Sequence, residues 1–396
     1  MRDRFSSRVS GESHTASEEL RLLIVCRHFS YGFGGTPEAI LMSTQALRRF
    51  GVYCDVFAAN QLYTDVGSFA ELPTKDSGVP TNWYALGISS RSAVWIVGSW
   101  VWAALPIASL ARIIGVPVLY SPKGQLCRVE FTGFAALYKA LYFWFIEFLV
   151  IALSKKIIFT SKLERMEMRF LRQIQEEKYC ILPEAFDVDL RCEKSRRANT
   201  ENPLTFGFIA QVSRRKGYRE LLDAYLDLCD QKPACETLLI IAGTPLANYK
   251  NEFEEINRRA ALRSGFKQVK FLGQVEKSAR NEFYKECDVI LVPSLFESFG
   301  LVPLEALSRN CAVVVAPKIG CLEFLPNCAE IFKISDVNAS AILEKLVDVC
   351  GVWPVMHDHK TDGPDFKSYL NTDKWAEKFL SLFSTGRSVR RSYSIN

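Results

Sequence analysis

Short apolar segments rich in β-branched residues alternate with longer helical segments twice along this chain, and a polar stretch separates the two series. Such alternation is typical of parallel sheets whose strands are joined by right-handed helical crossovers. We therefore predict an α/β protein with two doubly wound, Rossmann-like domains that face each other across a cleft. The first series comprises 21–26, 52–59, 94–99, 117–122, 155–162 and 179–186, and the second comprises 204–210, 237–243, 269–275, 288–294 and 311–317.

The domain boundaries follow from the same alternation. Residues 1–20 are polar and lack the apolar segment of a secretory signal, so we expect a disordered tail there. We expect an N-terminal domain over 21–190, a polar linker over 191–203, a C-terminal domain over 204–370, and a final helix and tail over 371–396. A length of 396 residues agrees with two domains.

Charge and cysteine content exclude several classes of protein. A net charge of +5, with Lys and Arg spread along the chain, argues against nucleic-acid binding. The twelve cysteines form no Cys-x-x-Cys pair, and several lie in apolar segments, so we expect buried free thiols in a reducing compartment. Cys350, His357 and His359 lack a fourth ligand at a zinc-site spacing, so we expect no metal site.

The segment 134–153 has the length of a transmembrane helix and carries only Lys139 and Glu147 as charged residues. The strand pattern of 155–162 follows at once and has to return to the same sheet, which argues against a membrane span. Two interpretations stay open. The segment is either a buried core helix or an interfacial helix whose aromatic side chains face lipid or an acceptor.

The most informative segment is 288–317, in which a buried strand ends at Pro293, a loop follows and a helix begins. A loop-to-helix junction exposes free N–H groups that suit a phosphate, and Gly300 permits a ligand to approach the backbone. Glu297 lies in the loop before the helix, and Glu305 lies about five residues inside the helix, roughly 7 Å along its axis. One carboxylate can accept hydrogen bonds from a hexose and the other from a ribose. The plain alternative is a first-turn acid and a surface acid.

Three other loops follow predicted strands and are expected at the same cleft. Arg214, Arg215 and Lys216 form a basic turn that can neutralise a diphosphate leaving group, or else a solvated turn. Gly32, Gly34 and Gly35 form the first turn of the N-terminal domain, and Lys123 and Gly124 lie in the segment SPKGQL. These glycine-containing turns are also common where no ligand binds.

Taken together, these motifs resemble the retaining glycosyltransferases of family 4, a group 1 family with the GT-B fold. The resemblance covers most of 22–345 and is densest at 204–325. ESFGLVPLEAL, SRRKG before a leucine-rich helix, FLGQV, and the pair GG at the first turn occur in the expected order. The order and spacing of four motifs is a more specific signal than any one of them.

The resemblance implies roles for individual residues. The N-terminal domain would bind the acceptor, and the C-terminal domain the nucleotide sugar. Glu297 would contact the donor sugar, Glu305 the ribose and Lys216 the phosphates, while backbone amides at the helix start would hold the pyrophosphate. The catalytic set is expected to be Glu297, Lys216 and Lys123. The donor-binding set is expected to be Gly34, Gly35, Arg215, Lys216, Glu297, Ser298, Phe299, Gly300, Leu301 and Glu305.

Several positions depart from the family pattern. Gln211 stands where an arginine is usual, five residues before the phosphate lysine, and an arginine of SRRKG is the candidate to replace its charge. Lys123 stands where a histidine is common. Glu184 and Ala185 replace the usual Asn-Gly, and Asn310 replaces a usual glycine.

The resemblance therefore implies a hexosyltransferase that moves a sugar from a nucleotide sugar to a lipid-linked or polysaccharide acceptor, without a metal or another cofactor. Surface polysaccharide biosynthesis (lipopolysaccharide, capsule or exopolysaccharide) is the expected process. We expect a cytoplasmic protein at the inner face of the membrane, with no nucleic-acid partner. Two alternatives are an epimerase-like enzyme, which needs acid–base carboxylates and histidines, and a non-catalytic sugar-nucleotide-binding protein.

Overall fold

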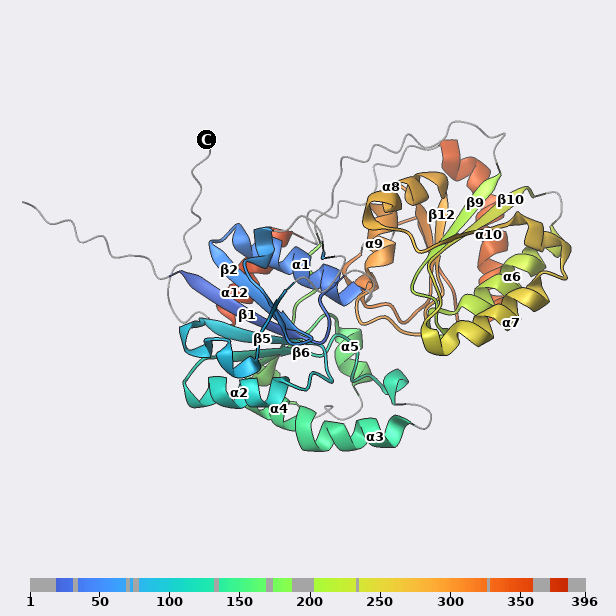
Figure 1. Ribbon diagram of the computed structural model, residues 1–396. Coiled ribbons are helices and arrows are strands. Elements are labelled where there is room, and N and C mark those ends of the chain that lie inside the picture. Colours follow the sequence, from blue (N-terminus) through green and yellow to red (C-terminus); the bar gives the residue numbers. More distant parts are fainter. Residues whose placement is uncertain are drawn as a thin grey trace, which may run out of the picture.

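The computed structural model describes residues 19–30, 35–68, 72–73, 78–131, 135–168, 174–186, 203–232, 235–325, 328–358 and 371–383. Two sheets lie in two separate domains, and helices cover both faces of each sheet (Figure 1). This arrangement confirms the predicted α/β fold with two doubly wound domains. Residues 1–18 of the predicted tail and 191–202 of the predicted linker lie outside the described residues.

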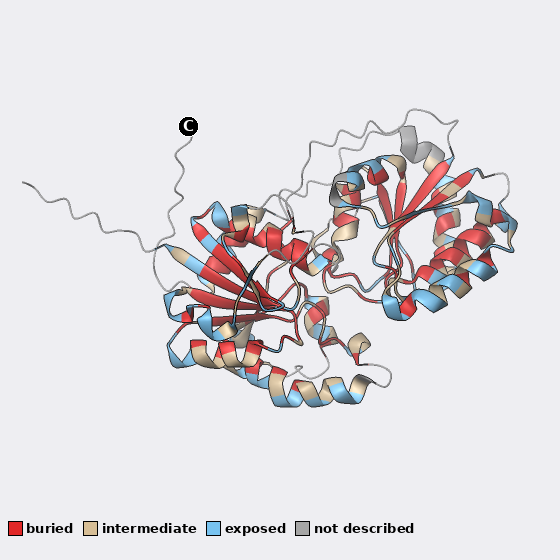
Figure 2. Ribbon diagram, viewed as in Figure 1, coloured by how far each residue is buried: buried red, intermediate tan, exposed pale blue. Residues whose placement is uncertain are grey.

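In the described part, the N-terminal sheet has eight strands in the order β4-β3-β2-β1-β5-β6-β7-β8. The central strands are apolar along their whole length because helices cover both of their faces (Figure 2). The strands are β1 (Leu20–Cys26), β2 (Val52–Ala58), β3 (Gln61–Tyr63), β4 (Val79–Pro80), β5 (Ala93–Val97), β6 (Val118–Ser121), β7 (Lys156–Phe159) and β8 (Tyr179–Ile181).

Two hydrophobic layers enclose this sheet. Helix α1 (Gly35–Arg48) and helix α12 (Thr372–Ser381) cover one face, so a helix from the end of the chain completes the N-terminal core. Phe379 of α12 packs on Trp95 of β5 with ring centroids 4.8 Å apart. The other face is covered by α2 (Ala104–Ile113) together with the helical segment that precedes β7.

The edge of the sheet departs from the prediction. β3 pairs antiparallel with both β2 and β4, whereas the pairings from β2 through β8 are parallel. These two edge strands are too short for hydrophobic periodicity to indicate them. The N-terminal sheet is therefore mixed rather than wholly parallel.

Two interpretations stayed open for the segment 134–153. Its described residues form α3 (Ala135–Tyr142), the π-helix η5 (Phe143–Glu147) and α4 (Phe148–Leu153). Within the described part, Ala136–Leu153 is the one helical segment long and apolar enough to cross a membrane, and 22% of it is buried. Glu147 is buried on the inner side and accepts a hydrogen bond from Tyr120 at 2.5 Å. The interpretation as a buried core helix is therefore wrong.

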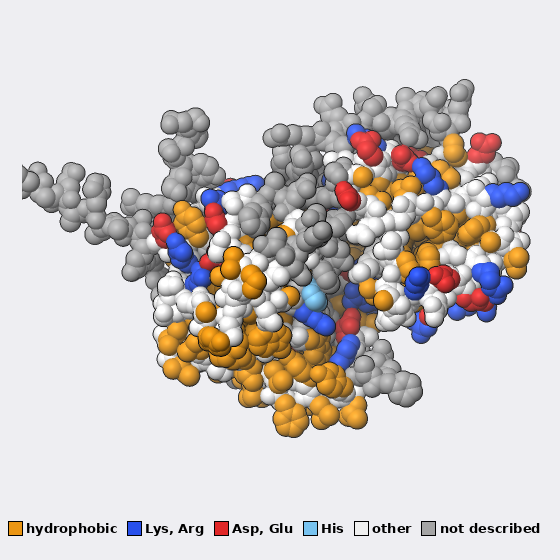
Figure 3. Space-filling model, in the orientation of Figure 1, with side chains coloured by type: hydrophobic (Ala, Val, Ile, Leu, Met, Phe, Trp, Pro, Cys, Tyr) orange, Lys and Arg blue, Asp and Glu red, His pale blue; other side chains and the backbone are white. Residues whose placement is uncertain are grey.

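The outer side of this segment forms an apolar surface on the N-terminal domain (Figure 3). We call it the α3–α4 face, and it consists of the exposed side chains of Leu137, Tyr138, Leu141, Trp144, Phe145, Phe148 and Leu149.

The C-terminal sheet has six parallel strands in the described part, in the order β11-β10-β9-β12-β13-β14. They are β9 (Leu204–Ile209), β10 (Thr237–Ala242), β11 (Val269–Gly273), β12 (Val289–Val292), β13 (Ala312–Val315) and β14 (Ile331–Lys333). The helices around them are α6 (Tyr218–Gln231), α7 (Lys250–Ala260), α8 (Lys277–Glu286), α9 (Leu301–Leu307) and α10 (Ala339–Asp358). β14 and α10 were not predicted. Gly351 and Pro354 interrupt the helical pattern of α10, because both residues disfavour a helix interior.

The cysteines of the described part are free, as predicted. Six of these eleven thiols are buried, and the other five are half-buried. Burial raises the pKa of the Cys26 thiol to about 12, so this thiol stays protonated and behaves as a small apolar side chain.

Candidate active site

A cavity of about 1080 Å³ lies between the two domains. Its lining residues follow β1, β6, β9, β10 and β12, so it lies outside the carboxyl ends of strands from both sheets, where doubly wound folds bind ligands. Gly34 lies outside the described residues. The other predicted site residues all line this cavity: Gly35, Lys123, Arg215, Lys216, Glu297, Ser298, Phe299, Gly300, Leu301 and Glu305.

Backbone hydrogen bonds hold the loop of residues 293–300, which joins β12 to α9. The Glu297 N–H donates to the Lys318 carbonyl at 2.9 Å, and the Glu297 carbonyl accepts from the Gly320 N–H at 3.0 Å. Because both of its peptide groups are paired, Glu297 presents its side chain from a fixed backbone position.

The start of α9 offers unpaired donors to the cavity. Gly300 has a φ of 86°, and a Cβ there would lie 2.9 Å from Ile319, so this turn requires glycine. In the described part of the chain, the amide N–H groups of Phe299, Gly300 and Leu301 have no hydrogen-bond partner. Three neighbouring N–H groups at the edge of a cavity suit an anion.

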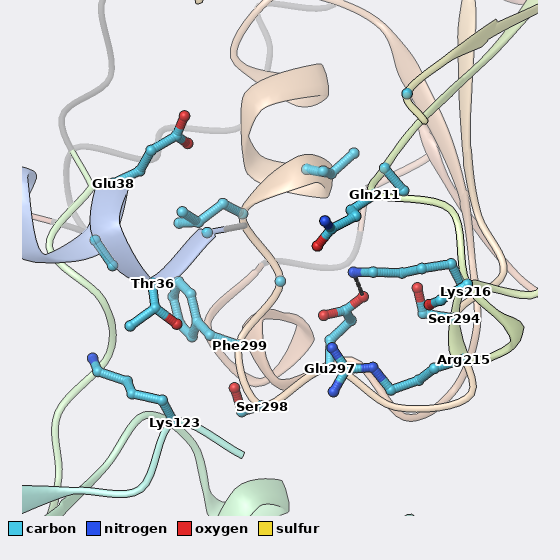
Figure 4. A pocket seen from close by; sticks show the side chains of 18 of the residues that line it. Thr36, Glu38, Lys123, Gln211, Arg215, Lys216, Ser294, Glu297, Ser298 and Phe299 are labelled. Atoms are coloured by element: carbon cyan, nitrogen blue, oxygen red, sulfur yellow. Dashed lines mark hydrogen bonds and ion pairs between the residues drawn. The ribbon is translucent and has the colours of Figure 1, made fainter. Parts of the chain in front are cut away.

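Lys216 and Glu297 form an ion pair across the C-terminal side of the cavity (Figure 4). Lys216 ends the short turn η7 (Arg214–Lys216), and Arg215 lies beside the same carboxylate. Burial pushes the pKa of Glu297 upward, but the charges of Lys216 and Arg215 and the hydrogen bonds from Lys216 and Ser294 more than offset it. The pKa therefore lies below its ordinary value, and Glu297 is a carboxylate at neutral pH.

The basic turn contributes one of its two arginines to the cavity. Arg214 points away and pairs with Glu252 at 2.7 Å on the surface. Arg215 lines the cavity and reaches across the cleft to Glu130 of the N-terminal domain at 2.9 Å. Of the two arginines proposed to replace the charge missing at Gln211, only Arg215 therefore lines the cavity, as Gln211 does.

Glu305 is held by two residues of α8. The Tyr284 hydroxyl donates to Glu305 at 2.7 Å, and Arg280 lies 3.7 Å from the same carboxylate. Arg280 also pairs with Glu38 of α1 at 2.7 Å, which joins the two domains at this end of the cavity. The predicted ribose-binding carboxylate is therefore oriented from its own domain and connected to the other.

Lys123 and Glu184 form a buried ion pair on the N-terminal side of the cavity. The Lys123 ammonium donates to both carboxylate oxygens, at 2.8 and 2.7 Å, and each side chain is less than 10% exposed. The ammonium also lies 5.6 Å from the centroid of the Trp95 ring. Lys123 and Glu184, which both depart from the family pattern, are thus partners of each other.

The two domains meet directly at Ser298. The hydroxyl groups of Thr160 and Ser161 donate to the Ser298 carbonyl at 3.0 and 2.7 Å. A Cβ on Gly124 would lie 2.9 Å from the Ser298 Cβ, so the SPKGQL turn leaves no room for a larger residue. These contacts hold the loop of residues 293–300 against the N-terminal domain.

The sequence did not indicate the partners Glu38, Glu130, Arg280 and Tyr284, and Glu184 stood out only as a departure from the family pattern. Arg280 is 242 residues from Glu38. Their one common signal was charge or polarity near a predicted strand end or helix end. Among the described residues, no group of three or more His, Cys, Asp or Glu side chains is placed to hold a metal ion.

Comparison with known proteins supports this description of the fold. The family described as glycosyl transferases group 1 matches residues 192–351. An uncharacterized glycosyltransferase of Methanocaldococcus jannaschii is 27% identical over 182 residues, 43% of this chain and 45% of that protein. A D-inositol 3-phosphate glycosyltransferase of Corynebacterium jeikeium is 30% identical over 143 residues, 34% of each protein. The chain thus spans less than half the length of these curated relatives.

Solved structures share the whole fold. Anabaena HepE in complex with UDP-glucose aligns over 92% of this chain and 96% of its own, with a TM-score of 0.64 and 17% identity. WaaG, a glycosyltransferase involved in lipopolysaccharide biosynthesis, aligns over 92% of this chain and 100% of its own, with a TM-score of 0.63 and 16% identity. The chain therefore has the GT-B fold of two facing Rossmann-like domains. Residues 192–351 match the group 1 glycosyltransferase family, which confirms the broader group to which the motifs pointed.

Proposed function

We propose that this protein is a retaining glycosyltransferase that moves a hexose from a nucleoside diphosphate sugar to a hydroxyl group of an acceptor. One observation carries the proposal. Glu297 and Glu305 line the same cavity, and the unpaired amides at the start of α9 lie between them in the sequence. Glu297 accepts hydrogen bonds from the hexose, Glu305 accepts from the ribose, and the diphosphate lies against the amides. The resemblance of the motifs to a retaining family supports retention.

The transfer step forms a bond between the acceptor oxygen and the anomeric carbon, while the bond from that carbon to the β-phosphate oxygen breaks. The electron pair of the broken bond leaves with the nucleoside diphosphate, and the acceptor proton passes to the departing phosphate oxygen. Lys216 and Arg215 balance the charge on that oxygen, and Lys123 lines the same cavity from the other domain. Glu297, which is ion-paired, positions the donor and does not act as a nucleophile.

Two alternatives fit the cavity less well. An epimerase-like enzyme needs acid–base carboxylates and histidines. The five glutamates of the lining are all engaged by cations or by Tyr284, and no histidine is among the described residues that line the cavity. A non-catalytic binding protein had Gln211 and Asn310 as its support. Arg215 adds a positive charge to the cavity that Gln211 lines, and Asn310 has a φ of 56°, a conformation that asparagine tolerates better than most residues with a side chain.

Donor binding tests the proposal in a thermal-shift screen of UDP-, GDP- and ADP-linked hexoses. A donor at about 100 times its Kd stabilises by about 2.7 kcal/mol, which raises the Tm by roughly 5–10 °C. Glu305→Ala should abolish this rise, because it removes the carboxylate that accepts hydrogen bonds from the ribose. Glu282→Ala, an exposed change on the same α8, should keep it. Absence of a shift with every donor contradicts the proposal.

We further propose that the protein works at the inner surface of the membrane, on a lipid-linked or polysaccharide acceptor in surface polysaccharide biosynthesis. The α3–α4 face supports this part, because Leu137, Tyr138 and Phe145 are each at least 70% exposed while the opposite side of the helix packs on the domain. Exposed Arg112 and Lys155 flank it and suit anionic headgroups. The segment lies along the domain and therefore contacts the bilayer from one side.

Flotation with lipid vesicles tests the membrane contact. The full chain should float with vesicles of phosphatidylcholine containing phosphatidylglycerol, and Trp144→Ser/Phe145→Ser should reduce the bound fraction about tenfold, since two large apolar side chains are lost from the interface. Leu262→Ser, at an exposed leucine of the C-terminal domain, serves as the control. Equal flotation of the double variant and the parent contradicts the contact, and so does a parent that stays in the soluble fraction.

A further inference from the structure

One cation of the cavity has no carboxylate partner among the described residues. Arg27 follows β1 and lines the N-terminal side of the cavity, and it has no ion pair in the described part of the chain. The other Lys and Arg side chains of the lining each have a carboxylate partner: Lys123, Lys139, Arg215, Lys216 and Arg280. A guanidinium that has no carboxylate partner at a ligand cavity is suited to a carboxylate or a phosphate of a substrate.

A buried hydroxyl without a partner lies in the same region. The Tyr142 hydroxyl is buried and has no hydrogen-bond partner, although Tyr142 lines the cavity. Burial, together with Glu147 and Tyr138, raises the pKa of Tyr142 to about 12, while nearby Arg27 lowers it. The hydroxyl is therefore protonated at neutral pH, and Tyr142 lines the same cavity as Arg27. An unpaired buried donor costs free energy that a ligand oxygen can recover.

Aromatic rings form the wall next to these two groups. Trp100 has a φ of 65°, a strained value for a residue with a side chain, and its N–H donates to buried Glu147 at 3.2 Å. Its ring lies 5.3 Å from the Tyr142 ring. Trp102 also lines the cavity and is 54% exposed. The C–H face of a sugar ring packs favourably against such indole rings.

The wall continues onto the apolar surface. Tyr138 lines the cavity and is at the same time a member of the α3–α4 face. A ligand that extends past Tyr138 therefore leaves the cavity directly over Leu141 and the rest of that face. This continuity fits a molecule with a polar end in the cavity and an apolar end on the membrane side.

We propose that Arg27, Tyr142, Trp100 and Trp102 form the acceptor subsite, and that the acceptor is a sugar joined through a phosphate to a lipid. Arg27 and the Tyr142 hydroxyl bind the phosphate, the indole rings pack on the sugar, and the lipid leaves along Tyr138. The phosphate ester stays intact, because the new glycosidic bond forms at a hydroxyl oxygen of the acceptor sugar. This assignment rests on the proposed glycosyltransferase function and adds the acceptor class to it.

Tryptophan fluorescence of the full chain tests the subsite, because Trp100 and Trp102 report directly on its occupancy. The probes are glucose, glucose 1-phosphate, glucose 1-(dodecyl phosphate) and inorganic phosphate. We expect glucose 1-phosphate to bind more tightly than glucose or inorganic phosphate, and the dodecyl ester at least tenfold more tightly again. Arg27→Ala should weaken both phosphorylated sugars at least tenfold, and Arg27→Lys less. Arg21→Ala, a change at the other end of β1, should bind as the parent does.

The outcome separates this proposal from the proposed function. Glu305→Ala should lose the nucleotide-sugar thermal shift and keep glucose 1-phosphate binding, whereas Arg27→Ala should do the reverse. Equal binding of the phosphorylated probes by Arg27→Ala and the parent overturns the subsite, and so does a parent that prefers none of them to glucose. Loss of donor binding in Arg27→Ala also overturns it, because Arg27 would then belong to the donor.

Discussion

Glu297→Gln is expected to lower the transfer rate by roughly 1000-fold, the scale of losing one charged group that positions a reacting substrate. The amide loses the negative charge that binds donor hydroxyls, and Lys216 loses its partner. A lower rate at saturating donor, measured by release of nucleoside diphosphate, distinguishes lost positioning from weaker binding. Glu282→Gln, on the surface of α8, is the matched control.

The fold should survive this substitution with a small loss of stability. Because the pKa of Glu297 is lowered in the folded protein, its carboxylate stabilises the fold above the unfolded pKa, and this contribution disappears as the pH falls through the lowered value. The Tm of Glu297→Gln should therefore fall modestly at pH 7. Full activity of Glu297→Gln would contradict the assignment of Glu297, and so would an unfolded Glu297→Gln protein.

Glu184→Ala is expected to destabilise the N-terminal domain by about 3–5 kcal/mol, because it leaves the buried Lys123 ammonium without its carboxylate. Urea unfolding followed by circular dichroism measures this loss as a lower midpoint. Replacing both members, as Lys123→Met/Glu184→Leu, should recover most of the stability, since no buried charge is then left alone.

Glu282→Ala provides the comparison, because it breaks the exposed pair with Lys285 and should cost less than about 1 kcal/mol. The coupling between Lys123 and Glu184 is the difference between the double variant and the sum of the single ones. An unchanged midpoint for Glu184→Ala would show that the two side chains are solvated separately and do not form a pair.

The regular elements were predictable where burial was uniform. The strands at the centre of each sheet, such as β1 and β12, are apolar on both faces and therefore stand out as continuous segments. The short edge strands β3 and β4 carry no such pattern, and β14 and α10 were also missed. Helix α10 was missed because Gly351 and Pro354, which disfavour a helix interior, lie within it.

The position of the site was predictable because strand ends converge in a doubly wound fold. The loops with Lys123, Lys216 and Glu297 were found in this way, and they line one cavity. Their partners were not predictable, because a contact such as Arg280 with Glu38 depends on the placement of two domains and not on local spacing.

The departures from the family pattern gain a physical explanation from the same contacts. Lys123 and Glu184 each look like an isolated loss of a usual residue, yet together they form one ion pair. A single sequence could not reveal such compensation, since the paired positions lie 61 residues apart.

The most direct test of the glycosyltransferase assignment is transfer by the full chain, with detergent-solubilised membranes of the source organism as acceptor. The donor is the nucleotide sugar with the largest thermal shift, and ³¹P NMR follows its phosphates. We predict that resonances of a nucleoside diphosphate replace those of the donor with the parent protein and not with Glu297→Gln. A donor that binds but stays intact, or equal release by both proteins, would contradict the assignment.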